Sequence, residues 1–277
     1  MKDFPQYILL YDKDCPLCVM YARLFARWGF MPPESFVAWS DGIQIKDLIF
    51  DYALSQDKIA LIHPQTNQVI YGIDSILKIL EQKLPWVGVI GRFPVIYFIL
   101  ERLYNFIAIN RKIIAAIDCG DHCPCYPSRR YSYRIVFILI CSIVVSSLVS
   151  LYFRDMLGAY RKPSIIQNEM FFFYGQIAFQ FLVFRGLKQK NFYNYAAHLS
   201  FVSFLGAILL GIAYVCLSLV HSLGMNIELL SPICFGIVLC FMFFEHKRRV
   251  ALEHWSAWLS LSWVIYRLII YPIAFQI

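Results

Sequence analysis

Hydrophobic residues are spaced in two different ways along the chain, and the change falls near residue 128. Before it, short apolar runs alternate with amphipathic stretches and turn residues, which is typical of packed strands and helices. After it, long apolar runs are separated by short polar loops, which is typical of helices that cross a membrane. The pattern therefore predicts a folded first half followed by a membrane half.

The first half alternates strand and helix signals. Runs rich in β-forming residues predict strands at Tyr7–Tyr11, Ser35–Trp39, Lys58–His63 and Gln68–Tyr71. Helical spacing of apolar residues predicts helices at Val19–Trp28, Ile43–Leu54 and Ile73–Leu84. The order β-α-β-α-β-β-α indicates an α/β domain, which we place at residues 1–85.

Residues 86–128 are interpreted as an amphipathic helical connector that ends in a Cys-rich turn. The stretch is strongly apolar, yet it carries five charged residues before that turn: Arg92, Glu101, Arg102, Arg111 and Lys112. Two placements stay open for its helices. They lie at the membrane surface or against the spans, or they are plain core helices of the α/β domain.

Residues 129–277 are predicted to form an all-α transmembrane domain of about five spans. The apolar runs behind this prediction are Ile135–Phe153, Met170–Phe184, Leu199–Val220, Leu229–Phe244 and Trp255–Phe275. A helix of about 20 apolar residues is long enough to cross the hydrocarbon core. Arg267 is the one charge well inside a predicted span, which makes it a candidate for function, whereas Glu169 is expected at the interface.

Composition and charge support this division. The chain is 60% hydrophobic and 16% charged, whereas soluble chains are about 45–50% apolar and about 25% charged. Residues 1–128 hold 12 Lys+Arg and 13 Asp+Glu, so the net charge of +7 comes from the membrane half. The basic residues there form short clusters between apolar runs, which argues against nucleic acid as a partner and favours lipid.

The basic clusters also predict the orientation of the spans. One side receives Arg129, Arg130, Arg134, Arg185, Lys188, Lys190, Lys247, Arg248 and Arg249. The other side receives Arg154, Arg161 and Lys162. Because short cytoplasmic loops carry the excess of Lys and Arg, the N-terminal domain is expected in the cytoplasm and the C-terminus outside. We expect an integral protein of a bacterial inner membrane.

Cys15 and Cys18 carry the clearest chemistry. They lie three residues apart at the expected start of a helix, directly after a strand. The positive end of a helix favours thiolate over thiol, and the spacing lets one thiol resolve a mixed disulfide formed by the other. The pair therefore indicates a redox-active dithiol, with half of a zinc site or two structural thiols as alternatives.

The segment Asp12-Lys-Asp-Cys15-Pro-Leu-Cys18 resembles the Asp-x-x-Cys-x-x-Cys motif of the DCC family of thiol–disulfide oxidoreductases. Two further features are similar to that family, Gly72-Ile-Asp74 and Tyr104-x5-Asn110-Arg111, so the likeness covers about residues 5–125. It implies a thioredoxin-like fold that needs no cofactor, with Cys15 as attacking thiol and Cys18 as resolving thiol. For Asp12 it implies proton transfer or loop positioning, and a plain turn carboxylate is the alternative.

The chain departs from the thioredoxin pattern at one point. Thioredoxins place an Ile/Val-Pro-Thr-like element before the third strand, whereas here Pro64 lies in the turn after that strand. The way in which a substrate is held therefore does not follow from the resemblance.

A second cluster of ligating residues precedes the first span. It consists of Cys119, His122, Cys123 and Cys125. Three interpretations stay open: a zinc site, a relay that exchanges with the Cys15/Cys18 dithiol, or structural thiols. A standing disulfide is disfavoured on the cytoplasmic side of a membrane.

The sequence thus predicts a membrane-anchored thiol–disulfide oxidoreductase that reduces or exchanges disulfides of a protein substrate. The alternative is a non-catalytic subunit of a membrane-protein complex, whose thioredoxin-like domain docks a partner and whose cysteines are structural or bind zinc. The helical half motivates this alternative, because it is larger than an anchor requires.

Overall fold

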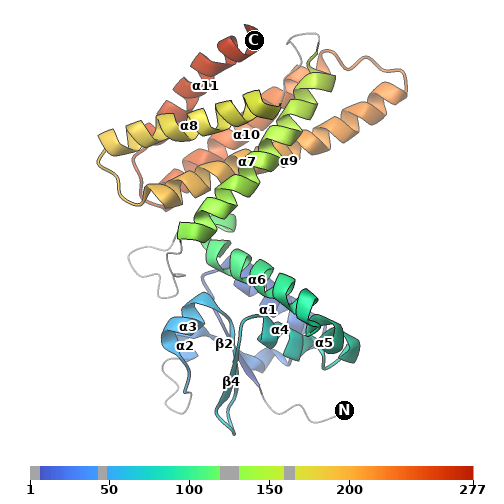
Figure 1. Ribbon diagram of the computed structural model, residues 1–277, viewed down its shortest axis with the longest axis vertical. Helices are drawn as coiled ribbons and strands as arrows, with labels where there is room; N and C mark the ends of the chain where they lie inside the picture. Colours follow the sequence, from blue (N-terminus) through green and yellow to red (C-terminus); the bar gives the residue numbers. More distant parts are fainter. Residues whose placement is uncertain (1–6, 43–48, 119–130, 159–165, 277) are drawn as a thin grey trace. The chain divides into compact units, whose positions relative to one another are not determined.

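The computed structural model describes residues 7–42, 49–118, 131–158 and 166–276, with only the backbone described for residues 271–276. The chain divides into two compact units, Met1–Tyr133 and Arg134–Ile277 (Figure 1). Each unit has its own core, and each is described here by itself.

A four-stranded mixed sheet forms the centre of the first unit. Its strands are β1 (Ile8–Tyr11), β2 (Phe36–Ala38), β3 (Ala60–His63) and β4 (Gln68–Tyr71), in the order β2-β1-β3-β4. β1 pairs parallel with β2 and antiparallel with β3, and β3 and β4 form the expected hairpin. All four strands lie within the segments that the sequence predicted.

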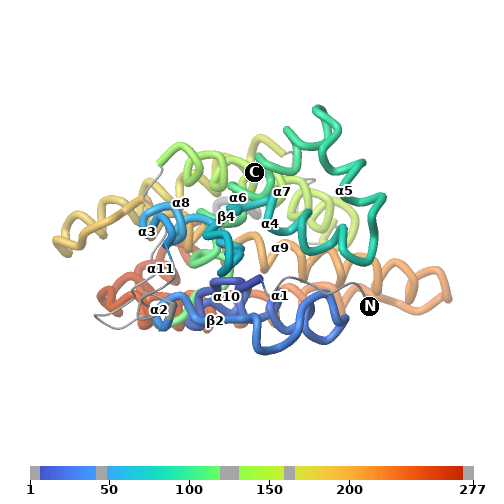
Figure 2. Tube along the Cα trace, turned by 90° about the horizontal axis from the view of Figure 1, so that it is seen from below, coloured from blue at the N-terminus to red at the C-terminus, as the bar shows by residue number. Residues whose placement is uncertain are grey.

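Helices cover both faces of this sheet. The first unit contains α1 (Pro16–Arg27), α2 (Trp39–Gly42), α3 (Tyr52–Asp57), α4 (Ile73–Leu80) and a short 3-10 turn at Pro33–Ser35. Leu9 of β1 faces a core shared with α1 and α4, whereas the adjacent Leu10 faces a core shared with Trp39 of α2. Figure 2 shows α1 and α4 on one side of the strands and α2 and α3 on the other. The unit is therefore an α/β domain of thioredoxin-like class, as predicted.

Three predicted helices differ in their bounds. The helix expected at Val19–Trp28 is α1, which begins at Pro16 and ends at Arg27. Residues 43–48 of the helix expected at 43–54 lie outside the described residues, and α3 begins at Tyr52 because Asp51 caps it with a bond from the Leu54 amide at 2.9 Å. α4 ends at Leu80 rather than Leu84. Residues 81–83 form a turn, and Leu84 precedes Pro85, which starts a new helix and disfavours helical geometry in the residue before it.

Two more helices, α5 (Pro85–Gly91) and α6 (Pro94–Ile114), complete the described part of the first unit. Large apolar side chains are exposed along both: Trp86, Val89, Ile90, Phe93, Val95, Phe98, Ile99, Leu103 and Ile107. The last turns of α6 are different, because residues 109–113 are all buried. The C-terminal end of α6 therefore belongs to the core of the first unit. For its first turns, which expose apolar side chains, placement at the membrane surface stays a prediction.

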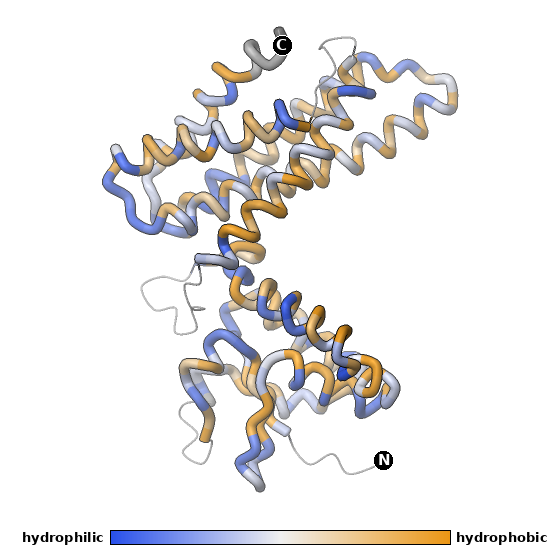
Figure 3. Tube along the Cα trace, viewed as in Figure 1, coloured by the Kyte–Doolittle hydropathy of each residue, from blue (hydrophilic) through white to orange (hydrophobic). Residues whose placement is uncertain are grey.

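The second unit consists of helices α7 (Tyr131–Met156), α8 (Ile166–Gly186), α9 (Phe192–Ser222), α10 (Leu230–Leu252) and α11 (Trp258–Gln276). Among the described residues, α7, α9 and α10 are long and apolar enough to cross a membrane (Figure 3). α8 is less apolar because Gln176 and Gln180 interrupt it, and both side chains are buried. The helical membrane domain is confirmed, and the count of five spans stays a prediction.

A polar network ties four helices of this unit together. The hydroxyl of Tyr195 (α9) donates to Gln180 Oε1 (α8) at 2.9 Å and lies 3.1 Å from His246 Nε2 (α10). Ser262 (α11) donates to the same Gln180 oxygen at 3.1 Å. Polar side chains inside a helical bundle bond to one another because lipid offers them no partner.

The core of the first unit depends on Leu9, which is fully buried at the centre of the sheet. We expect Leu9→Ala to destabilise this unit by about 2–5 kcal/mol, since it removes buried apolar contacts and leaves a cavity. Pulse proteolysis of the full-length protein in urea measures the effect. Leu103→Ala, at a side chain that is 51% exposed, is the matched control, and an equal loss of stability in both variants would contradict the assigned core.

Candidate functional site

The two motif cysteines lie where β1 passes into α1. Cys15 is the N-cap residue of α1, Pro16 is the first helical residue, and Cys18 lies in the first turn. Proline fits this position because the first helical amide has no partner within the helix. Both cysteines are free thiols, and their exposed fractions are only 0% and 5%. The predicted dithiol geometry at a helix start is therefore present, and it is buried.

The two thiols ionise very differently. The pKa of Cys15 is lowered to about 6, chiefly because the Cys18 thiol donates a hydrogen bond to its thiolate. A backbone hydrogen bond from Cys18 and the nearby Arg111 guanidinium lower this pKa further, against the effect of burial. The pKa of Cys18 is raised, because its proton is held by Cys15 and because it is buried. Cys15 is thus the thiolate of the pair near neutral pH.

Asp12 supports the loop that carries the dithiol. Its Oδ1 accepts a hydrogen bond from the Asp14 amide at 3.0 Å, and its backbone carbonyl accepts one from the Cys15 amide at 3.2 Å. Its Oδ2 lies 3.2 Å from Lys112 Nζ and 3.6 Å from Arg111 Nη2. All three charged side chains are buried. Asp12 therefore combines the turn role with a buried ion cluster, and its part in any reaction stays a prediction.

The ion cluster is joined to α3 and α6. Arg111 donates to the Gln56 carbonyl at 2.9 Å, so its guanidinium is fixed beside the dithiol. About two turns earlier on α6, the Tyr104 hydroxyl accepts a hydrogen bond from the Ile59 amide at 2.9 Å. A Cβ at Gly72, whose φ is +70°, would lie 3.3 Å from the Tyr104 ring. Glycine at this position therefore permits both the left-handed backbone and the close approach of α6.

An apolar cavity of about 200 Å³ opens beside Cys18, and we call it the Cys18 pocket. Its walls include Leu17, Ile59, Ile76, Ile107 and Ala108. Arg111 and the rings of Tyr21 and Tyr104 also line it. Burial raises the pKa of Tyr21 and raises that of Tyr104 to about 12, so both hydroxyls stay protonated near the dithiol. The pocket is largely apolar, with sulfur and a few polar atoms in its wall.

The second predicted cluster, Cys119, His122, Cys123 and Cys125, lies outside the described residues. Within the part of the chain that the structure describes, no group of three or more His, Cys, Asp or Glu side chains could hold a metal ion. Exchange between two thiols and a disulfide needs no cofactor.

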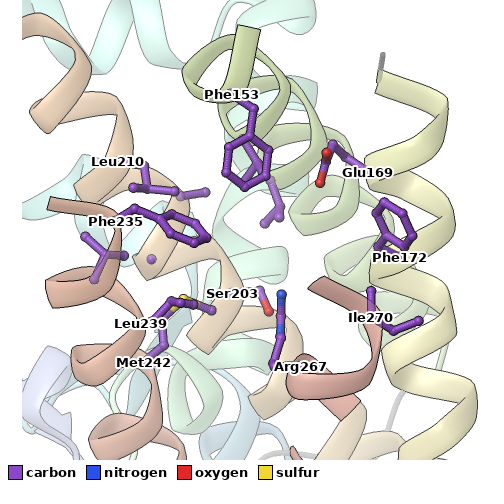
Figure 4. A pocket seen from close by; sticks show the side chains of 15 residues that line it. Phe153, Glu169, Phe172, Ser203, Leu210, Phe235, Leu239, Met242, Arg267 and Ile270 are labelled. Carbon is purple, nitrogen blue, oxygen red and sulfur yellow. The ribbon is translucent and has the colours of Figure 1, made fainter. Parts of the chain in front are cut away.

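A different cavity, of about 50 Å³, lies within the second unit. Figure 4 shows Glu169 of α8 and Arg267 of α11 with their charged ends turned toward it, among apolar side chains of the neighbouring helices. Arg267 also lies over the Trp263 ring at 5.2 Å. Glu169, expected at the interface, is buried between helices. The volume suits one or two water molecules, which polar groups inside proteins commonly bind.

A buried dithiol at the start of the first helix, directly after the first strand of a small mixed sheet, defines the thioredoxin-like class of thiol–disulfide oxidoreductases. Residues 9–115 match the family model of the DCC1-like thiol-disulfide oxidoreductases, so the first unit carries a domain of that family, as its motif predicted. The helical unit lies outside the match. No match was found among curated proteins or among solved structures.

Sequence reasoning missed the functional position of Arg111 and Lys112. It counted them as charges on an apolar connector, whereas they meet Asp12 beneath the dithiol. One signal was present: Tyr104 and Arg111 are seven residues apart and so share a helix face, and both belong to the family resemblance. Both residues of that face line the Cys18 pocket together with Cys18.

We expect Arg111→Met to raise the pKa of Cys15 above about 6, because a nearby positive charge that favours the thiolate is removed. At a pH just above the original pKa, the fraction of Cys15 present as thiolate should fall severalfold. A rise of one pKa unit, about 1.4 kcal/mol, lowers the ratio of thiolate to thiol tenfold. The ultraviolet absorbance of the thiolate across pH, taken as the difference from Cys15→Ser, measures this without requiring a reagent to reach the buried sulfur.

Two variants control this experiment. Arg111→Lys keeps the charge and should retain most of the low pKa, and Arg102→Met removes an exposed charge from the same helix and should leave the profile unchanged. An unchanged titration of Cys15 in folded Arg111→Met would show that the guanidinium does not act on the thiolate.

Proposed function

We propose that this protein is a membrane-anchored thiol–disulfide oxidoreductase whose cytoplasmic Cys15/Cys18 dithiol reduces or exchanges disulfides of a protein substrate. The observation that carries the proposal is the pair of free thiols at the start of α1, with Cys15 at the N-cap and Cys18 in the first turn. The Cys18 thiol keeps its proton and lowers the pKa of Cys15, so that one thiol is nucleophilic while the other is protonated. A nucleophilic thiolate next to a protonated thiol is what two-step exchange requires.

The proposed reaction proceeds through a mixed disulfide. The Cys15 thiolate attacks one sulfur of the substrate disulfide, a bond forms between them, and the other substrate sulfur leaves as a thiolate that takes up a proton. Cys18 then loses its proton and attacks the Cys15 sulfur, which releases the second substrate thiolate. Two electrons pass to the substrate, and Cys15 and Cys18 are left joined as a disulfide.

The placement in the membrane rests on the positive loops. Nine Lys and Arg on the side of the first unit against three on the other favour a cytoplasmic dithiol in a bacterial inner membrane. A reducing compartment keeps such a pair in the dithiol form, which suits reduction of incoming disulfides.

Purified full-length protein should show a reversible two-electron couple for the pair, followed by mass spectrometry of alkylated peptides. Cys15→Ser should abolish the couple, and Cys18→Ser should accumulate the mixed disulfide because the resolving thiol is gone. Cys141→Ser, which removes a buried thiol of α7, is the matched control. A couple that persists in Cys15→Ser refutes the assignment, and a stoichiometric partner retained by that variant favours a non-catalytic subunit.

The orientation can be tested with single added cysteines, since the native dithiol is too buried for labelling. Gln65→Cys lies in the exposed β3–β4 turn, and Leu223→Cys is exposed at the end of α9. In intact cells an impermeant maleimide should label Leu223→Cys above the background of the parent protein. Gln65→Cys should react only after the membrane is permeabilised, and the reverse pattern would overturn the cytoplasmic placement.

A further inference from the structure

Access to the dithiol is restricted. Cys15 is completely buried and Cys18 is 5% exposed, so a flat disulfide-bearing surface does not reach either sulfur in this conformation. Cys18 is, however, part of the wall of the Cys18 pocket. A group that enters this pocket therefore comes next to the sulfur pair, because Cys18 and Cys15 share a hydrogen bond.

The size and chemistry of the pocket define what it can hold. It encloses about 200 Å³ between apolar side chains, and a cavity of about 150 Å³ with a similar Leu, Ile and Phe lining binds benzene. Such a space accepts an aromatic ring or a branched aliphatic group. Charged groups are disfavoured there, because the one cation in the wall, Arg111, is already bonded to the Gln56 carbonyl and paired with Asp12.

The approach to the pocket is apolar as well. Val95, Ile99, Leu103 and Ile107 follow one another at four-residue intervals on α6, and all four are exposed. Residues at this spacing form one ridge on a helix. Ile107 belongs both to this ridge and to the wall of the Cys18 pocket, so the ridge leads to the pocket mouth.

We infer that the Cys18 pocket is a substrate subsite that binds an aromatic or branched aliphatic group carried next to the disulfide being reduced. The group belongs either to a small disulfide or to a side chain beside cystine in a peptide. The inference rests on the proposed function and adds a substrate class to it. It assigns recognition to α6, which supplies Ile107 and Ala108, and the exchange chemistry stays with Cys15 and Cys18.

The test fills the pocket and compares matched substrates. Full-length protein in mild detergent is reduced, freed of reductant and mixed with one disulfide at a time in single-turnover experiments. The small probes are phenethyl disulfide and hydroxyethyl disulfide, and the peptide probes are cystine peptides with Phe or Ser next to the cysteine. Wild-type protein should prefer the aromatic member of each recognised pair by about tenfold or more, which is the effect of burying one ring-sized apolar group.

Ala108→Phe should occupy the pocket and lower this preference about tenfold. Val89→Phe adds the same ring to an exposed side chain of α5, outside both the pocket and the ridge, and should keep the preference. Ala108→Leu is a milder filling variant in case the larger ring disturbs folding, and the Cys15/Cys18 couple measured in each variant reports an intact site. Partition of the apolar probes into detergent is the same for all proteins and cancels in the comparison.

The outcomes distinguish failure of the proposed subsite from failure of the proposed function. A preference lost in the Ala108 variants alone supports the subsite, and its presence with small probes or with peptides identifies the source of the apolar group. A couple that is intact while the preference is absent in wild type, or unchanged in Ala108→Phe and Ala108→Leu, overturns the subsite and leaves the proposed function standing. A wild-type protein without a reversible couple overturns the proposed function itself.

Discussion

The buried ion cluster of Asp12, Arg111 and Lys112 is the interaction on which the first unit depends. It joins the loop after β1 to the end of α6, segments about a hundred residues apart. Burying charges costs free energy unless they are paired, and loss of one partner leaves the remaining charges buried without compensation. The motif loop and the last turns of α6 are therefore fixed together. The Arg111 guanidinium of this cluster also favours the ionised form of Cys15.

Much of the first unit could be predicted from spacing. Strand alternation located β1 to β4, and a dithiol after a strand indicated the redox site, because both signals are local in the sequence. The ion cluster could not be predicted in this way, because no local sequence pattern around Asp12 indicates that it pairs with residues about a hundred positions later. The apolar surface of α6 concealed it further: Phe98 and Leu103 are exposed, while the neighbouring turns 109–113 are buried, so one helix combines two environments.

The helical unit buries polar groups in neutral hydrogen bonds as well as in ion pairs such as Arg249 with Glu245. Gln180, Tyr195 and His246 are spread over three helices and bond to one another, so their partners come from packing and not from charge pairing. The sequence predicted the helices because long apolar runs are conspicuous. In α8, Gln176 and Gln180 lower the hydropathy of the helix, and both side chains are buried. Counting apolar residues measures contact with lipid poorly when a span is polar on its inner side.

The difference in ionisation between Cys15 and Cys18 also sets which thiol reacts first in the proposed exchange. The pKa of Cys18 is raised chiefly by its hydrogen bond to Cys15, and that bond is strongest when Cys15 is a thiolate. Once Cys15 is joined to a substrate sulfur it carries no charge, so the main cause of the raised pKa disappears and Cys18 becomes easier to ionise. A thiol of low pKa is also the better leaving group. Attack by Cys18 on the Cys15 sulfur expels the substrate thiolate and completes the proposed exchange, whereas attack by the first substrate thiolate on the sulfur joined to Cys15 expels Cys15 and reverses it. The competition between these two attacks sets how far the proposed exchange proceeds, and a substrate group held in the Cys18 pocket, the proposed subsite, would keep the mixed disulfide next to Cys18.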